Sequence, residues 1–179
     1  MENRLIVAGF GGQGVMMIGQ LLCCAAIDCG KEALFLPHYG PEQRGGTANC
    51  SVTLSDQAIG SPTVRRIDVL IAMNQPSLAK FAGRVKEGGV ILANSGLCQG
   101  PPEGCAARYL PIPVDEEAER LGSRKVANIV MLGAYNGAAG IFSEEELLAA
   151  VRKKLGKKPQ FLGMNEAAVR RGMALGAIS

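Results

Sequence analysis

A glycine-rich turn near the start of the chain has the first spacing that points to chemistry. Gly9, Gly11 and Gly14 stand at the G-x-G-x-x-G spacing, between a short apolar run and a longer one. Such a turn lets a phosphate approach the amino end of a helix, where free N–H groups and the helix dipole favour anions. The candidate site, for a cofactor or for an interface, therefore includes the whole turn: Gly9, Gly11, Gly12, Gln13 and Gly14.

The second half of the dinucleotide fingerprint is missing. A nicotinamide or flavin domain needs Asp or Glu at the end of the second strand to hold the ribose, whereas here that strand ends Phe35-Leu36-Pro37-His38. Glu32 precedes the strand and is misplaced for this task. Three alternatives remain: glycines that only pack strand against helix, a phosphate site for another ligand, or a loop that contacts another subunit. The amide of Gln13 both donates and accepts, so it suits a surface with mixed partner groups.

A second loop, at 37–46, carries a denser set of polar groups. Its Pro and Gly residues predict irregular structure, and five of its residues join the candidate site: Tyr39, Glu42, Arg44, Gly45 and Gly46. A solvated Glu42–Arg44 pair on a plain connecting loop is the alternative. If the two loops lie side by side at the carboxyl ends of the first two strands, Arg44 and the glycine turn line an anionic or interface site.

Other classes of function have little support. The six cysteines include no Cys-x-x-Cys pair and His38 is the single histidine, so neither a metal centre nor a Ser-His-Asp or Cys-His apparatus has its usual residues. The formal charge of +3 does not suggest a nucleic-acid binder. No apolar run reaches the roughly 18–20 residues of a membrane span. Met1 leads directly into a strand pattern with no cleavage site, so we expect a cytoplasmic protein without membrane contact.

The elements that would position these loops alternate between strands and helices. Apolar or alternating runs predict strands at 4–8, 33–36, 49–54, 67–73, 89–93 and 108–112. Longer runs predict helices at 14–29, 76–85, 114–121, 126–139, 144–155 and 165–174, with a capping box between Ser143 and Glu146. This order predicts one Rossmann-like α/β domain over residues 1–179, with a mostly parallel sheet and helices on both faces.

The first predicted helix is apolar almost all round, which is typical of a helix that is buried on every side. One side meets the sheet. The other side needs either a partner chain or the last helices of the same chain.

The two loops together resemble a known family, the gamma subunit of the 2-oxoacid:ferredoxin oxidoreductases. The likeness covers nearly the whole chain, and Asn128 is included in the candidate site because it lies in the last of the similar stretches. The segments that carry the resemblance are Gly9–Val15, Tyr39–Gly46, Ser61-Pro62, Ile67–Leu70, Gly88–Ile91, Pro111–Pro113 and Val126–Ala134.

The resemblance implies a domain packed on alpha and beta chains, with a delta ferredoxin-like chain left open as a further partner. Enzymes of this family decarboxylate a 2-oxoacid on thiamine diphosphate with Mg²⁺, pass electrons through iron–sulfur clusters to ferredoxin, and release an acyl-CoA. This chain lacks a cluster-binding cysteine run and a Gly-Asp-Gly motif for thiamine diphosphate. The resemblance therefore implies that the cofactors lie in other subunits and that the isolated chain, which is free to self-associate, is inactive.

The substrate is a finer question. The Tyr-Gly-Pro-Glu-x-Arg-Gly-Gly loop is more similar to the 2-oxoglutarate branch than to the pyruvate branch, whose loop resembles Arg-x-Arg-Gly-Gly-Gln-Gly. Branched-chain oxoacids and indolepyruvate stay open. The alternative from another class, motivated by the glycine turn alone, is a free-standing nucleotide-binding sensor.

Overall fold

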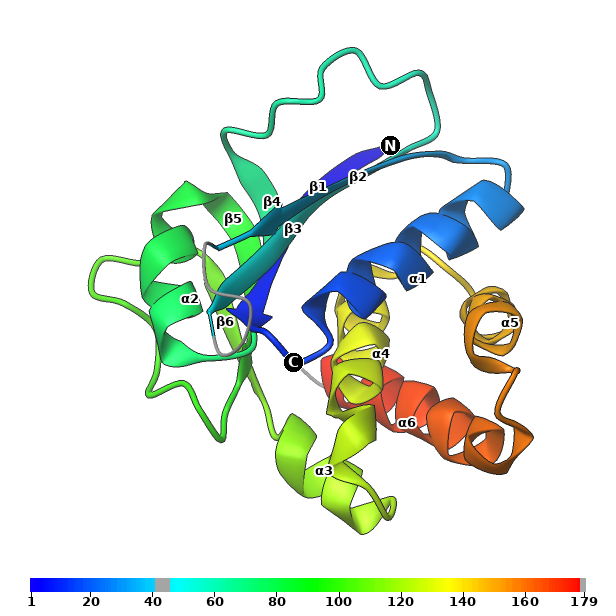
Figure 1. The fold of residues 1–179 in the computed structure, drawn as a ribbon. Coiled ribbons are helices and arrows are strands. Elements are labelled where there is room, and N and C mark those ends of the chain that lie inside the picture. Colours follow the sequence, from blue (N-terminus) through cyan, green and yellow to red (C-terminus); the bar gives the residue numbers. More distant parts are fainter. Residues whose placement is uncertain (41–45, 178–179) are drawn as a thin grey trace.

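A six-stranded sheet forms the middle layer of the protein (Figure 1). The computed structural model describes residues 1–40 and 46–177. The strands lie in the order β2-β3-β1-β4-β5-β6. Their bounds are β1 Glu2–Phe10, β2 Glu32–Tyr39, β3 Thr47–Ser55, β4 Ile67–Ala72, β5 Val85–Asn94 and β6 Arg108–Ile112. Within the described residues β3 is the one strand that runs against its neighbours, so the predicted mostly parallel sheet is confirmed.

β3 lies between β1 and β2 and pairs with both in antiparallel register. Successive side chains of a strand point to opposite faces. One face of β3 is apolar and joins the main core through Ala48, Cys50, Val52 and Leu54. The other face is polar and consists of Asn49, Ser51, Thr53 and Ser55.

Helices cover the two faces of the sheet unequally (Figure 1). Their bounds are α1 Val15–Asp28, α2 Gln75–Phe81, α3 Val114–Arg120, α4 Ala127–Ala139, α5 Glu144–Leu155 and α6 Pro159–Ala177. On one face α1, α4, α5 and α6 form the main core with Leu5 and Val7 of β1. On the other face α2 packs over Ile6 and Ala8 in a smaller core, against β1 and β4.

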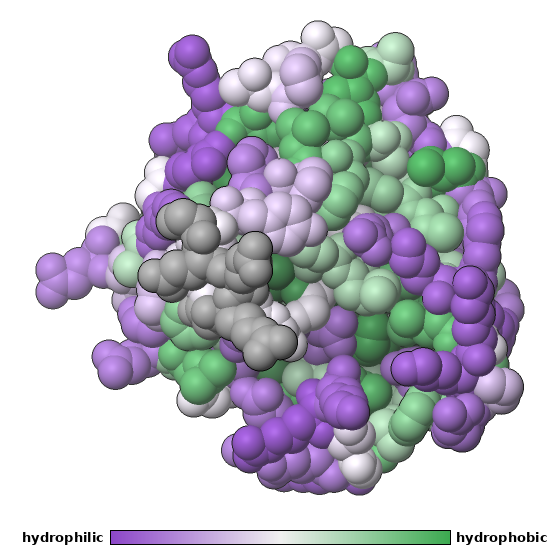
Figure 2. Space-filling view, viewed as in Figure 1, coloured by the Kyte–Doolittle hydropathy of each residue, from purple (hydrophilic) through white to green (hydrophobic). Residues whose placement is uncertain are grey.

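The second side of α1 is covered mainly by the chain itself. α1 packs on β2 and β3 on one side and on α4 and α5 on the other, so the last helices bury most of it. A strip remains in which Met16, Met17 and Cys24 are only partly buried and Ile27 is 62% exposed. Figure 2 shows apolar surface across the region where α1 lies in Figure 1.

Glycines allow α4 and α6 to pack unusually closely. A Cβ on Gly133 would lie 2.2 Å from the carbonyl oxygen of Val169, and one on Gly172 would lie 2.0 Å from that of Val130. Any side chain at these positions would push the two helices apart. This contact fixes α6 against the helix that begins beside the glycine turn.

Several predicted boundaries were wrong for identifiable reasons. Pro37, His38 and Tyr39 belong to β2 and not to a loop, because β2 is an edge strand and an edge strand tolerates a proline where no ladder N–H is needed. α6 begins at Pro159 and not at 165, since Pro fits the first turn of a helix. The predicted helix 76–85 ends at Phe81, continues as a 3₁₀ turn over Ala82–Arg84, and gives way to β5 at Val85.

The capping box of α5 is confirmed. The N–H of Ser143 donates to Oε2 of Glu146 at 2.7 Å, and the N–H of Glu146 donates to Oγ of Ser143 at 3.3 Å.

Among the described helices, none combines the length and the apolar character that a membrane crossing would need.

Candidate functional site

The glycine turn joins β1 to α1 in a conformation that requires glycine. Gly12 and Gly14 have φ values of 97° and 74°, in the left-handed region that other L residues rarely adopt. Gly14 is the N-cap of α1, and a Cβ there would lie 2.4 Å from Nδ2 of Asn128. A Cβ on Gly9 would lie 2.9 Å from Cβ of Met73. Close packing therefore requires glycine at positions 9 and 14, and the backbone conformation favours it at position 12, before any ligand is considered.

The side chain of Gln13 points into the protein. Its Oε1 accepts hydrogen bonds from the N–H of Phe10 at 2.7 Å and from Nδ2 of Asn74 at 2.9 Å. Its Nε2 donates to the carbonyl oxygen of Met73 at 3.0 Å. The sequence interpretation placed this amide on a mixed surface, whereas the structure pairs it with groups of the same chain across the carboxyl ends of β1 and β4.

Gln13 also crosses the crevice in which a dinucleotide would lie. In open α/β sheets a ligand binds outside the carboxyl ends of the strands, where the strand order reverses, and here that point lies between β1 and β4. The bonds from Gln13 to Met73 and Asn74 close this gap. In addition, β3 separates β1 from the end of β2, where an acid would hold the ribose. Both features argue against the binding of a dinucleotide at this edge of the sheet.

Two buried asparagines extend the polar network along the same edge of the sheet. Asn74, just after β4, accepts at Oδ1 from the N–H of Ser77 at 2.9 Å and so caps α2. Asn94, the last residue of β5, donates to Oδ2 of Asp115 at 2.8 Å. Sequence reasoning missed both asparagines. The sequence did contain a signal for them, because an Asn stands at the end of each of the two buried strands. Asn74 is in addition followed by Pro76 at a helix start.

The two loops singled out in the sequence meet at one edge of the sheet. The N–H of Gly11 donates to the carbonyl oxygen of Gly46 at 3.0 Å. They meet because β3, which runs back along β1, places Thr47 opposite Phe10. A cavity of about 330 Å³ lies between them, lined by both loops and by Met16. Tyr39 is 74% exposed beside it. Glu42, Arg44 and Gly45 lie outside the described residues.

Asn128 packs against the other side of the turn. Its Nδ2 donates to the carbonyl oxygen of Gly14 at 3.4 Å. A cavity of about 200 Å³ next to it is lined by Asp115, Arg124 and Lys125, among others. The carboxylate of Asp115 and the cations of Arg124 and Lys125 give this cavity a mixed charge, and Arg124 is also paired with Glu119. The structure thus brings together Gly9, Gly11, Gly12, Gln13, Gly14, Gly46 and Asn128, with Tyr39 at the margin.

Three of the described cysteines, Cys23, Cys50 and Cys98, are buried in the core. Burial raises the pKa of Cys23 to about 11, that of Cys98 to about 11 and that of Cys50 to about 12, so these thiols stay protonated near neutral pH. In the described part of the chain, no group of three His, Cys, Asp or Glu side chains is placed to hold a metal ion.

The fold and the turn define a Rossmann-like α/β domain whose glycine turn is closed by a side-chain amide. Residues 4–175 match the family model of the pyruvate ferredoxin/flavodoxin oxidoreductases. The chain belongs to this family.

Known proteins agree with this assignment over most of the chain. The ketoisovalerate oxidoreductase subunit VorA of Methanothermobacter thermautotrophicus is 42% identical over 92% of this chain and 34% of its own length, so the chain spans about a third of that relative. The 2-oxoglutarate synthase subunit KorC of Methanocaldococcus jannaschii is 37% identical over 84% of this chain and 82% of its own.

A solved structure supports the fold. The gamma subunit of a keto/oxoacid ferredoxin oxidoreductase from Geobacter sulfurreducens superposes with a TM-score of 0.86, at 31% identity, over 99% of both chains. The predicted Rossmann-like α/β fold and the predicted likeness to gamma subunits are confirmed.

Proposed function

We propose that this chain is the gamma component of a thiamine-diphosphate- and iron–sulfur-dependent 2-oxoacid:ferredoxin oxidoreductase. The assembled enzyme would convert a 2-oxoacid and CoA to an acyl-CoA, CO₂ and reduced ferredoxin. The observation that carries the proposal is the family match over residues 4–175, together with full-length similarity to a gamma subunit.

In this proposal the cofactors lie in partner chains. Thiamine diphosphate with Mg²⁺ would supply carbanion stabilisation for decarboxylation, and iron–sulfur clusters would carry the electrons. The residues of this chain fit neither group well, because the described part offers no clustered metal ligands and its most buried thiols are hard to ionise. The role left for the chain is to support the partners and to shape the CoA side of the reaction.

The two loops are the part of the chain to which we assign this role. The glycine turn lies at the amino end of α1, where anionic groups of CoA or of a partner would be favoured, and the bond from Gly11 to Gly46 holds the second loop beside it. We assign Arg44 and Glu42 to the same role on the basis of the sequence alone.

Alpha and beta chains are the proposed partners. Met16 and the exposed Tyr39 both line the cavity between the loops, and the partly exposed strip of α1 with Ile27 continues from there. Apolar side chains next to a polar loop are a common composition for a subunit contact. A delta ferredoxin-like chain and ferredoxin itself would then be reached through the complex.

The substrate we propose is 2-oxoglutarate, which would give succinyl-CoA. The form of the Tyr39–Gly46 loop and the similarity to KorC support this choice. The higher identity to VorA makes ketoisovalerate the competitor to test.

Co-purification tests the assembly. The tagged full chain, purified without air from its native host, should elute with thiamine-diphosphate-binding chains and with the visible absorbance of iron–sulfur clusters. The preparation should reduce ferredoxin or viologen with CoA and 2-oxoglutarate faster than with ketoisovalerate or pyruvate. A chain that elutes alone would contradict the proposal, and faster turnover of another oxoacid would correct the substrate.

Calorimetry on the isolated chain tests the sensor alternative. NAD, FAD and ATP should give no binding heat, because Gln13 closes the crevice that a nucleotide would need. Tight binding of any of the three would instead support a nucleotide sensor.

A further inference from the structure

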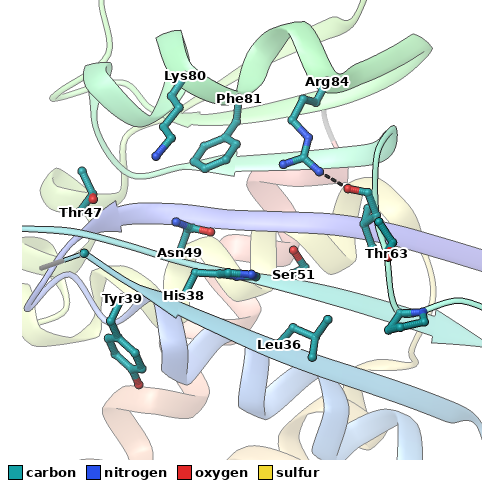
Figure 3. Close-up of a pocket in the computed structure, with 13 residues that line it drawn as sticks. Leu36, His38, Tyr39, Thr47, Asn49, Ser51, Thr63, Lys80, Phe81 and Arg84 are labelled. Atoms are coloured by element: carbon teal, nitrogen blue, oxygen red, sulfur yellow. Dashed lines mark hydrogen bonds between the residues drawn. The ribbon is translucent and has the colours of Figure 1, made fainter.

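The face of the sheet that carries α2 has an open groove over β2 and β3. α2 packs on β1 and β4, and a hollow of about 660 Å³ remains beside it. Leu36, His38, Asn49 and Ser51 form its floor, while α2 and the segment at 62–64 form its walls. In Figure 3, Lys80 and Phe81 face His38 and Asn49 across the groove.

The floor of this groove is polar where a buried sheet would be apolar. Asn49 lies opposite His38 in the β2–β3 ladder, and Ser51 lies opposite Leu36. Sheets of α/β proteins that are covered on both faces have near-continuous apolar strands. The polar residues at alternate positions of β3 therefore indicate a face that meets water or polar groups of another molecule.

The groove is also cationic. Lys80 and Arg84 flank the Phe81 ring, with their charged groups 5.3 Å and 6.0 Å from the ring centroid. Nε of Arg84 donates to the carbonyl oxygen of Arg65 at 3.1 Å, and a terminal nitrogen donates to that of Val64, which holds the guanidinium on this wall. The described lining residues include no Asp or Glu. A negatively charged, acceptor-rich occupant would complement this surface.

The shape of the groove favours a polypeptide over a small ligand. Small-ligand pockets enclose roughly 70–90% of their ligand, whereas this hollow follows the edge strand β2 and has the exposed His38 on its floor. It shares Tyr39, Gly40 and Thr47 with the cavity beside the glycine turn. An extended loop could therefore contact the groove along its length and end near the turn.

We propose that the groove is the docking site for an acidic loop of a partner subunit. The inference rests on the proposed function, because the partner is a chain of that assembled enzyme. It gives the gamma component a second contact, on the face of the sheet opposite α1, so that partner chains hold the glycine turn from both sides.

Hydrogen exchange on the free chain and on the purified complex tests the site. Peptides from 34–40, 47–53 and 75–84 should exchange several-fold more slowly in the complex. An intact complex in which these peptides exchange at the free rate would overturn the docking site alone. Failure to isolate any complex would remove the proposed function and, with it, this inference.

Charge variants test the chemistry of the occupant. Lys80→Glu and Asn49→Asp should each weaken association with the partner chains on the order of tenfold at low ionic strength, and less at high salt. Lys154→Glu, an exposed change on α5, is the matched control and should leave association unchanged. Asn49→Asp alters charge with almost no change of volume, so it decides the matter if Lys80→Glu fails to fold. Unchanged affinity in the folded variants would refute the proposal.

The NMR signal of the single histidine can distinguish a protein occupant of the groove from a small anion. His38 is the single histidine of the chain and lies in the groove, so its imidazole gives one assignable NMR signal. Inorganic phosphate, ATP and CoA should not shift this signal beyond an ionic-strength control. A saturable shift would identify the groove as a small-ligand site and overturn the proposal.

Discussion

Asn74 donates a 2.9 Å hydrogen bond to the same Gln13 oxygen that accepts from the N–H of Phe10. Asn74 in turn accepts from the N–H of Ser77 in the first turn of α2. These bonds connect the glycine turn, which leads into α1 on one face of the sheet, with the helix that covers the other face. The turn is therefore a structural junction as well as a candidate site.

Loss of this junction should destabilise the fold. Gln13→Ala removes the acceptor of the Phe10 N–H and of Nδ2 of Asn74, and leaves the carbonyl of Met73 with only the 3.5 Å bond from Asn94. We therefore expect the free energy of unfolding to fall by about 1–3 kcal/mol. Urea titration followed by circular dichroism measures the change. Gln57→Ala, on an exposed loop, is the control and should stay within about 0.5 kcal/mol. Equal effects at both positions would contradict the role of the Gln13 amide.

Two glycines of the turn should respond differently to Ala. Gly12→Ala meets no atom within 4 Å and is opposed only by its φ of 97°, which costs about 1–2 kcal/mol. Gly14→Ala has a similar backbone cost and also meets Nδ2 of Asn128 at 2.4 Å, so it should be clearly more destabilising. Adding Asn128→Ala should recover part of the loss. Thermal melts of the three variants measure these differences. A melting temperature of Gly14→Ala no lower than that of Gly12→Ala would contradict the predicted clash with Asn128.

The close contact between α4 and α6 predicts a large effect of one methyl group. Gly133→Ala would place Cβ 2.2 Å from the carbonyl oxygen of Val169, and we expect a loss of about 3 kcal/mol or more, or no folding at all. Gly163→Ala, on α6 with no atom within 4 Å of its Cβ, is the control. It should stabilise the helix by about 0.5–1 kcal/mol. Urea midpoints that moved together would contradict this account.

Glu117 should make stability depend on pH. Its side chain is 5% exposed, and hydrogen bonds from Arg171, at 2.7 Å and 3.0 Å, hold the pKa of this carboxyl below its ordinary value. Burial opposes this shift, and Arg120 adds to it. Because the folded pKa is depressed, this carboxylate stabilises the fold above its unfolded pKa. That contribution is lost as the pH falls through the folded pKa.

Arg171→Ala tests this pair. It should lower stability at pH 7 by about 1–3 kcal/mol and move the acid-induced loss to higher pH. Arg170→Ala, which removes a pair with the half-exposed Glu144 and a longer one, at 3.7 Å, with Glu166, is the control and should change stability less. Urea titrations at pH 7 and pH 4 measure both. If the two variants showed the same pH profile, Glu117 would not be the responsible group.

Local signals in the sequence predicted most elements of the fold. The strand at 108–112 coincides with β6, and both bonds of the Ser143–Glu146 capping box are present. These features depend on neighbouring residues only. The position of β3 between β1 and β2 was not predicted, because strand order depends on pairing between distant segments. The alternation in 49–54 predicted a strand, and the structure shows that its alternate residues form one apolar and one polar face.

The candidate site was predictable in its glycines and not in its amides. Left-handed backbone at Gly12 and Gly14 is a local demand of the turn. The orientation of Gln13 depends on Met73 and Asn74, which are 60 and 61 residues away along the chain. No pattern near Gln13 contains that information. The roles assigned to Glu42, Arg44 and Gly45 stay predictions from the sequence.

The residue between the glycines has a diagnostic value that glycine spacing lacks. A search that accepts any amino acid at the fifth place of G-x-G-x-x-G would group this chain with dinucleotide enzymes. A search that also asks for Gln at that place, and for Asn two residues after the neighbouring parallel strand, would separate it from them. Gln13 and Asn74 are thus a two-position sequence signature for a glycine turn that is closed by a side-chain amide. Uncharacterised sequences can be screened for this signature by alignment alone.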